Sequence, residues 1–94
     1  MANERATSVW EALVDTPEEA ENLRIRSQLM RAIIRVVKAW DVSQTEAAKR
    51  LHVTQPRLND LLKGKVDKFS LDALVNLLAG ADLRLEVSVS SKAA

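Results

Sequence analysis

Three polar side chains in the middle of the chain have the chemistry to read DNA bases. Gln55 and Asn59 are four residues apart, which places them on one face if the segment is helical, and Arg57 lies between them. A side-chain amide can bind the edge of adenine through two hydrogen bonds, and a guanidinium can bind guanine in the same way or hold a phosphate. We therefore predict that Gln55, Arg57 and Asn59 contact bases in a major groove.

A second group of residues has the chemistry to hold a phosphate backbone. Gln44 and Thr54 stand at expected helix starts, where side-chain and backbone donors commonly bind phosphate oxygens. The basic side chains that would surround them are Lys49, Arg50, Lys63, Lys65 and Lys68. Contacts of this kind would make the affinity for DNA fall with salt.

Charge is distributed unevenly along the chain. Residues 1–22 hold six acidic residues and one basic residue, whereas the remainder holds 13 basic and seven acidic residues. A basic cluster by itself is typical of any solvated surface. Its position within a helix-turn-helix pattern favours DNA binding instead, and the acidic segment then has another role.

Other kinds of chemistry find little support in the sequence. The absence of cysteine excludes disulfides, thiol nucleophiles and cysteine-containing zinc sites. His52 is the one histidine, so we expect it to end a helix and expect neither a metal site nor a cofactor. The carboxylates Glu18, Glu19 and Glu21 lie at an expected helix start, where negative charge is favourable. With no nucleophile, base and orienting group together, we expect a binding protein and not an enzyme.

The candidate contact residues need helices to present them, and the sequence contains repeated helix-start signals. Ser8, Thr16 and Ser43 are hydroxyl residues that are each followed three residues later by a carboxylate. Gly64 and Gly80 are each expected to supply the left-handed residue that ends a helix. From the apolar periodicity we predict helices from Pro17 to Ala39, from Gln44 to Leu51, from Gln55 to Lys63, and from the cap Ser70 to Gly80.

The two short central helices have the pattern of a helix-turn-helix motif. Helices that cross steeply need a small residue at their contact, here Ala48, and a turn residue that tolerates left-handed backbone, here His52. The apolar residues expected to face inward are Leu51, Val53, Leu58 and Leu61.

At the C-terminal end the periodicity changes to strict alternation, which predicts one β-strand from Leu83 to Val89. Its apolar face would consist of Leu83, Leu85, Val87 and Val89. A lone strand exposes unpaired edges, so these four residues are predicted dimer or partner contacts. The partner is either the same strand of a second copy or the edge of another protein's sheet.

At the N-terminal end, residues 1–15 are interpreted as an acidic arm, and residues 16–94 as the domain. The arm contains a short capped segment, Ser8 to Val14, with Trp10 as its aromatic residue. Trp10 either folds back onto the core or anchors a partner. The chain starts without a basic and then apolar leader, and its most apolar stretch is too short to span a bilayer, so we expect a cytoplasmic protein without a membrane segment.

The segment Gln44 to Lys63 resembles the helix-turn-helix of the Xre and phage-repressor family. The matching residues are Gln44, Ala48, Val53, Leu58 and Leu61, while His52 stands where the family usually has glycine. Histidine is among the non-glycine residues enriched at positive φ, so the turn can still form. The resemblance implies a mainly α fold, with four to five helices of the Xre-type domain and the C-terminal strand.

Across residues 8–89 the chain is also similar to HigA-like antitoxins. That resemblance implies a repressor of its own operon that neutralises a RelE/HigB-like ribonuclease toxin. Our first hypothesis is a homodimeric repressor on a palindromic double-stranded operator. The alternative is an interaction protein that mainly binds and inhibits the toxin.

Overall fold

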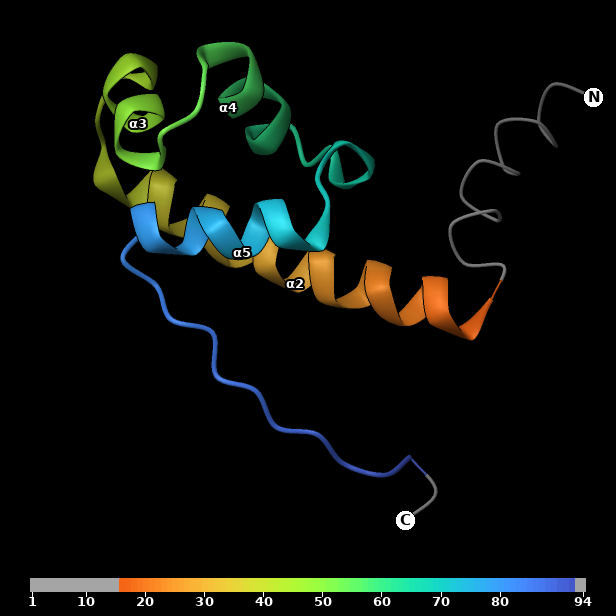
Figure 1. Cartoon of the computed structure of the whole chain (residues 1–94). Coiled ribbons are helices and arrows are strands. Elements are labelled where there is room, and N and C mark those ends of the chain that lie inside the picture. Colours follow the sequence, from red (N-terminus) through yellow and green to blue (C-terminus); the bar gives the residue numbers. More distant parts are fainter. Residues whose placement is uncertain (1–15, 93–94) are drawn as a thin grey trace, which may run out of the picture.

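The computed structural model describes residues 16–92, which form a bundle of helices followed by an extended C-terminal tail (Figure 1). The elements are α2 (Pro17–Trp40), α3 (Gln44–Leu51), α4 (Gln55–Leu62), the 3-10 turn η1 (Val66–Lys68) and α5 (Leu71–Gly80). The four α-helices confirm the bounds expected from the sequence to within one residue at each end. The mainly α fold is therefore confirmed.

Hydroxyl side chains cap every described α-helix at its start. Each cap oxygen accepts a hydrogen bond from the backbone N–H three residues later: Glu19 to Thr16, Glu46 to Ser43, Arg57 to Thr54 and Ala73 to Ser70, at 3.1–3.2 Å. These bonds satisfy donors that a helix start would otherwise leave unpaired. The expected cap at Ser8 lies outside the described residues.

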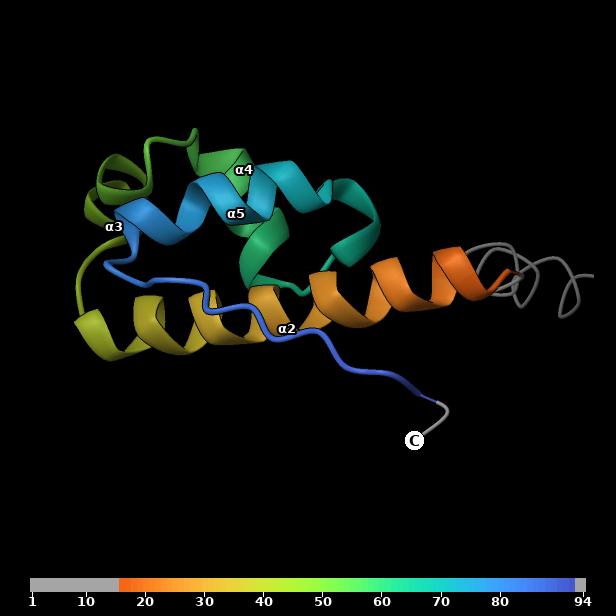
Figure 2. The same cartoon turned by 60° about the horizontal axis from the view of Figure 1, so that its bottom comes forward.

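The core lies between the two longest helices and the helix-turn-helix pair. Helices α2 and α5 lie side by side and run in the same direction, with α3 across their C-terminal ends (Figures 1 and 2). Every buried side chain of the described residues is apolar. The largest of the almost completely buried side chains are Phe69, Ile33, Leu58, Leu61 and Leu74.

Gly80 is the last residue of α5, but it does not adopt the left-handed conformation that the sequence predicted for it. A Cβ atom at this position would lie 2.5 Å from the carbonyl oxygen of Arg50 and 2.9 Å from Cα of Leu51. The glycine therefore allows α5 and α3 to touch backbone to backbone. The left-handed conformation is taken by Asp82 instead (φ 58°), whereas Gly64 (φ 73°) follows α4 as expected.

The predicted C-terminal β-strand is not found. Residues 83–92, here called the tail, contain no strand in the described chain. The physical reason is that a strand needs hydrogen bonds to a neighbouring strand, and no second extended segment lies beside the tail within residues 16–92. Alternation in the sequence predicted the extended backbone but could not supply its partner.

None of the described helices combines the length with the apolar character that crossing a bilayer requires.

Candidate nucleic-acid interface

The turn between α3 and α4 sets the crossing of the two helices. His52 adopts the left-handed conformation (φ 59°), as predicted, and its N–H donates to the carbonyls of Ala48 and Lys49. The N–H of Val53 donates to the Ala48 carbonyl at 3.0 Å, which closes the end of α3. Since Ala48 is buried and small, α4 can pack closely against α3 at this point.

The outer face of α4, defined here as Gln55, Pro56, Asn59 and Lys63, is exposed to solvent. It lies opposite Leu58 and Leu61, which are buried in the core. As predicted, the structure places the Gln55 and Asn59 side chains on one face. It adds Pro56, which was not among the predicted contact residues.

Gln55 is fixed to the neighbouring helix by a side-chain bond. Its amide Nε2 donates to the hydroxyl Oγ1 of Thr45 in α3 at 3.0 Å. The amide keeps its Oε1 oxygen and one N–H without a partner among the described residues. Thr45 was not among the predicted site residues. Its position as the second residue of α3, close to an expected helix start, was the feature of the sequence that could have indicated it.

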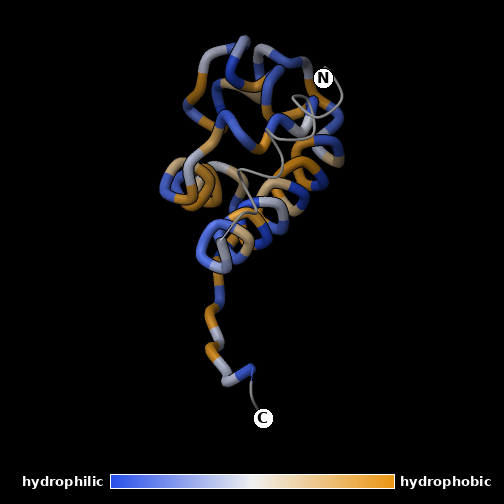
Figure 3. The backbone as a smooth tube through the Cα atoms, turned by 90° about the vertical axis from the view of Figure 1, so that its right-hand side faces the viewer, coloured by the Kyte–Doolittle hydropathy of each residue, from blue (hydrophilic) through white to orange (hydrophobic). Residues whose placement is uncertain are grey.

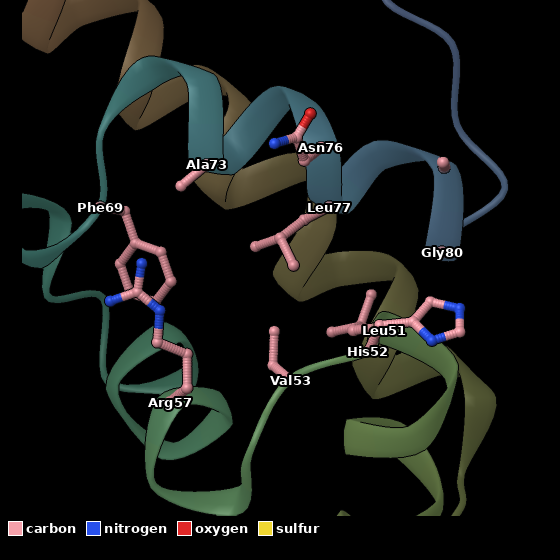
Figure 4. A pocket seen from close by; sticks show the side chains of 10 residues that line it. Leu51, His52, Val53, Arg57, Phe69, Ala73, Asn76, Leu77 and Gly80 are labelled. Atoms are coloured by element: carbon pink, nitrogen blue, oxygen red, sulfur yellow. The ribbon is translucent and has the colours of Figure 1, made fainter.

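Arg57 is turned away from the outer face and toward Phe69 (Figure 4). Its Cζ atom lies 4.1 Å from the centre of the Phe69 ring, and its Nη1 donates to the Lys68 carbonyl at 2.9 Å. The side chain is half-buried at the wall of a pocket of about 400 Å³ between the α3–α4 turn and α5. The structure thus separates Arg57 from Gln55 and Asn59, and base contact by Arg57 stays a prediction.

A second arginine holds the same loop from the opposite side. Arg26 of α2 donates from Nη1 to the carbonyls of Val66 (3.1 Å) and Phe69 (3.3 Å). Together with Arg57, which binds the Lys68 carbonyl, it supplies side-chain donors to three carbonyls of the segment from Val66 to Phe69. The sequence interpretation missed this role of Arg26, because nothing local links residue 26 to a loop 40 residues away.

The predicted phosphate-contacting basic residues fall into two groups. Arg50 is engaged by Glu46 (Nε to Oε2, 3.2 Å) and lies over the Trp40 ring, and Lys65 lies 3.5 Å from a carboxylate oxygen of Asp60. In contrast, the side chains that are exposed and have no hydrogen-bond or ion-pair partner in the described part of the chain are Lys49, Lys63 and Lys68. The second group is available to phosphates without breaking a protein contact.

The two predicted contacts at helix starts also differ. Gln44, the first residue of α3, is exposed. The hydroxyl of Thr54 already accepts the cap bond from Arg57 N–H at 3.2 Å. Thr54 would therefore contribute to a phosphate site indirectly, by capping the start of α4, whose backbone N–H groups can bind phosphate oxygens.

This arrangement of α3, turn and α4 is that of a helix-turn-helix domain, and comparison with known proteins agrees. A family model described as a helix-turn-helix domain matches residues 12–90. A solved structure described as an XRE-family transcriptional regulator is similar, with a TM-score of 0.71 and 31% sequence identity over 79% of this chain and 83% of that chain. The chain belongs to the XRE helix-turn-helix family. No curated protein matches the sequence.

Family membership explains which parts of the XRE motif the fold requires. Ala48, Leu58 and Leu61, which carried the resemblance, are buried, and Val53 is half-buried beneath the turn. His52, at the position where the resemblance implied glycine, adopts a positive φ of 59°. The match therefore rests on residues that set the helix crossing.

The residues predicted to bind a partner are not brought together with the DNA-facing set. Leu83 is half-buried against the core, whereas Leu85, Val87 and Val89 are increasingly exposed along the tail, at 42%, 75% and 90%. Trp10 lies outside the described residues. The XRE domain thus presents its helix-turn-helix and its tail as separate surfaces.

Proposed function

We propose that this chain is a DNA-binding transcriptional regulator, a binding protein and not an enzyme, that inserts the outer face of α4 into the major groove. The observation that carries the proposal is the exposed face itself: two amides four residues apart, with Lys63 one turn further and no carboxylate bound to either amide. An α-helix of this kind fits the major groove, where amides distinguish adenine from the other bases.

Gln55 and Asn59 are the proposed base contacts. The bond from Gln55 to Thr45 orients the Gln55 amide before DNA arrives, which lowers the entropy lost on binding. Pro56 lies beside them with its apolar ring exposed, and a thymine methyl group is the base feature that such a surface contacts best.

Phosphate contacts come from the free lysines and the helix starts. Lys49, Lys63 and Lys68 have no protein partner among the described residues, so they neutralise phosphates without losing an ion pair. Gln44 and the capped start of α4 add hydrogen-bond donors at fixed positions.

The finer assignment is a homodimeric autorepressor. Two copies would place two α4 helices in successive major grooves, about one helical turn of DNA apart, and would read a palindromic operator. DNA upstream of the protein's own gene is the first operator to test.

The test is a titration of that DNA by fluorescence anisotropy at low and moderate salt. Wild type binds, and Gln55→Ala and Asn59→Ala each lower the preference over unrelated DNA, by about 10-fold or more per lost amide contact. Asn76→Ala, at an exposed asparagine of α5 away from the outer face of α4, is the matched control. Absence of binding at low salt, or equal behaviour of Asn59→Ala and Asn76→Ala, would refute the proposal.

A second candidate function, inhibition of a basic ribonuclease toxin, is favoured by the position of the acidic residues. The described acidic residues of segment 1–22 lie at the start of α2, at the end of that helix remote from α3 (Figure 1). Glu21 is bound to Arg24, while Glu18 and Glu19 are exposed without an ion pair in the described chain. A basic protein could bind there while α4 remains on DNA.

This second candidate is tested by co-purification with the product of the adjacent gene. If that product is a basic ribonuclease, the pair Glu18→Lys and Glu19→Lys weakens the complex, and Asp72→Lys at the start of α5 does not. Failure to co-purify, or equal binding by the two variants, would remove the antitoxin role and leave DNA binding untouched.

A further inference from the structure

The middle of the tail has a backbone without hydrogen-bond partners in the part of the chain that the structure describes. The N–H of Leu83 donates to the carbonyl of Leu78 at 2.9 Å, which ties the start of the tail to α5. From residue 84 to residue 90, no backbone group bonds to any part of residues 16–92. The tail runs along α2 and then projects from the helices (Figures 2 and 3). It is an extended segment with a free edge.

The tail also carries an apolar face that its own helices do not cover. Figure 3 shows the alternation of apolar and polar residues along it. Leu85 and Val87 face a groove of about 620 Å³ that separates the tail from α2 and α5. The apolar residues that line the groove are Ile25, Leu29, Leu71, Val75, Leu85 and Val87. An apolar face beside a free edge is a surface that needs a second strand.

The bond of Leu83 indicates which edge of the tail faces away from the helices of its own chain. In extended backbone, the N–H and C=O of one residue point to one edge, and those of the next residue to the opposite edge. The odd-numbered edge starts at Leu83, whose N–H is directed to the body of its own chain. The groups of Arg84, Glu86 and Ser88 therefore point to the edge away from that bond.

The charges on the tail indicate which kind of strand can pair with this edge. Arg84 and Glu86 have opposite charges and are two residues apart on the face that alternates with the leucines. If a second tail pairs in antiparallel orientation about a two-fold axis at Leu85, Arg84 of each copy lies opposite Glu86 of the other. The same register places Leu85 opposite Leu85 and Leu83 opposite Val87, so the apolar side chains share one face.

Other symmetric registers lose either the ion pairs or the continuous apolar face; an axis at Val89, for example, pairs Glu86 with Lys92 but sets Val87 opposite Ser91. An axis at residue 84 or 86 places like charges directly opposite each other, which is destabilising. An axis at Val87 pairs Arg84 with Ser90 and Glu86 with Ser88, so no ion pair forms. An axis between two residues brings apolar side chains opposite charged ones. The Leu85-centred register alone combines two ion pairs with a continuous apolar face.

We propose that two copies of this chain dimerise through an antiparallel two-stranded ribbon of their tails, centred on Leu85 and hydrogen-bonded through the even-numbered edge. The inference deepens the homodimer of the proposed function, on which it rests for its biological use. It also accounts for the absence of a strand in the single chain: the strand forms only when the second copy supplies its ladder.

The test is a charge-reversal cycle followed by sedimentation velocity without DNA. Arg84→Glu places glutamates opposite each other twice in the dimer, and Glu86→Arg does the same with arginines, so each weakens dimerisation by roughly tenfold. The double variant Arg84→Glu with Glu86→Arg restores both ion pairs and the original net charge, and dimerises like wild type. Both substitutions lie on exposed side chains, so the melting curves of all three variants stay close to that of wild type.

Three results would overturn the ribbon: a wild-type chain that stays monomeric at all concentrations, single variants that dimerise like wild type, or a double variant that is not rescued. A tail that pairs only with a different protein gives the first result. Asn59→Ala, which removes a proposed base contact, leaves the dimer unchanged. If the chain dimerises but binds no DNA, the proposed regulator function is refuted and the tail-to-tail dimer still stands. If the chain stays monomeric but binds DNA, the tail-to-tail dimer is refuted and the regulator function still stands.

Discussion

The guanidinium of Arg57 lies over the ring of Phe69, with Cζ 4.1 Å from the ring centre, and also donates to the carbonyl of Lys68. Arg57 thus joins α4 to the loop that presents Lys68. Arg26 of α2 holds the carbonyls of Val66 and Phe69 in the same loop. The lysine-bearing loop is positioned by two arginines that themselves face the protein.

We predict that Arg57→Ala lowers the free energy of unfolding by about 1–2 kcal/mol, because it removes a cation–π contact and a charged hydrogen bond. Its affinity for operator and for unrelated DNA should fall by similar factors. Urea denaturation and anisotropy titrations measure the two effects, with Asn76→Ala as the surface control. A variant of unchanged stability that loses preference for one base pair would show that Arg57 reads a base, as the sequence predicted.

Gly80→Ala should destabilise the protein, although alanine is normally the better helix residue by about 1 kcal/mol. Here the added Cβ would meet the backbone of Arg50 and Leu51, which cannot rotate away, so overpacking of about 1–3 kcal/mol outweighs the helix preference. The midpoint of urea denaturation measures the change.

Gly64→Ala is the comparison, because nothing lies within 4 Å of its Cβ position and its cost comes from the positive φ alone. That cost is about 1–2 kcal/mol, and Gly64→Asn should recover part of it. If Gly80→Ala proves as stable as wild type, α3 and α5 are not in the close contact described.

The free lysines should control the salt dependence of DNA binding. Lys49→Ala, Lys63→Ala and Lys68→Ala should each reduce the slope of log K against log salt by about 1, because each removes one phosphate contact. Arg50→Ala should change the slope less, since Arg50 is engaged by Glu46 and Trp40. Titrations at four or five salt concentrations measure these slopes. Equal slopes for all four variants would contradict the division into free and engaged residues.

The pair Glu21–Arg24 should add a small pH-dependent contribution to stability. The hydrogen bond from Arg24 lowers the pKa of Glu21 below its ordinary value. Because the folded-state pKa is lowered, the contribution is present above the unfolded-state pKa and is lost as the pH falls through the folded-state pKa. Both side chains are exposed, so the effect on stability is small. Carboxyl NMR titration should show the Glu21 pKa rising in Arg24→Gln but not in Arg31→Gln; an unchanged value in Arg24→Gln would exclude the bond.

Local patterns predicted most of this fold, because the signals act over a few residues. Thr16, Ser43, Thr54 and Ser70 cap their helices as expected from a hydroxyl at each helix start, and His52 takes the positive φ that the turn requires. The exposed face of Gln55 and Asn59 follows from helical periodicity alone.

Contacts between distant segments could not be predicted in this way. Gly80 follows the last apolar residues of a helix, a place where glycine commonly ends a helix in the left-handed conformation. Only the tertiary structure shows that a glycine is needed here because the backbone of Arg50 lies too close for a Cβ atom. Arg57 has the spacing of a base contact, but Phe69, 12 residues later, competes for it.

The sequence by itself determined the helices, their caps and the residues available on α4, because these depend on backbone preferences and periodicity within one or two turns. Only the tertiary structure decided which basic residues are free: it turned Arg57, Arg26 and Arg50 toward the protein and left Lys49, Lys63 and Lys68 exposed. The physical reason is that a charged side chain binds whichever carbonyl, carboxylate or ring the fold brings within reach, and for Arg26 and Arg57 those groups lie outside the helix that carries the side chain.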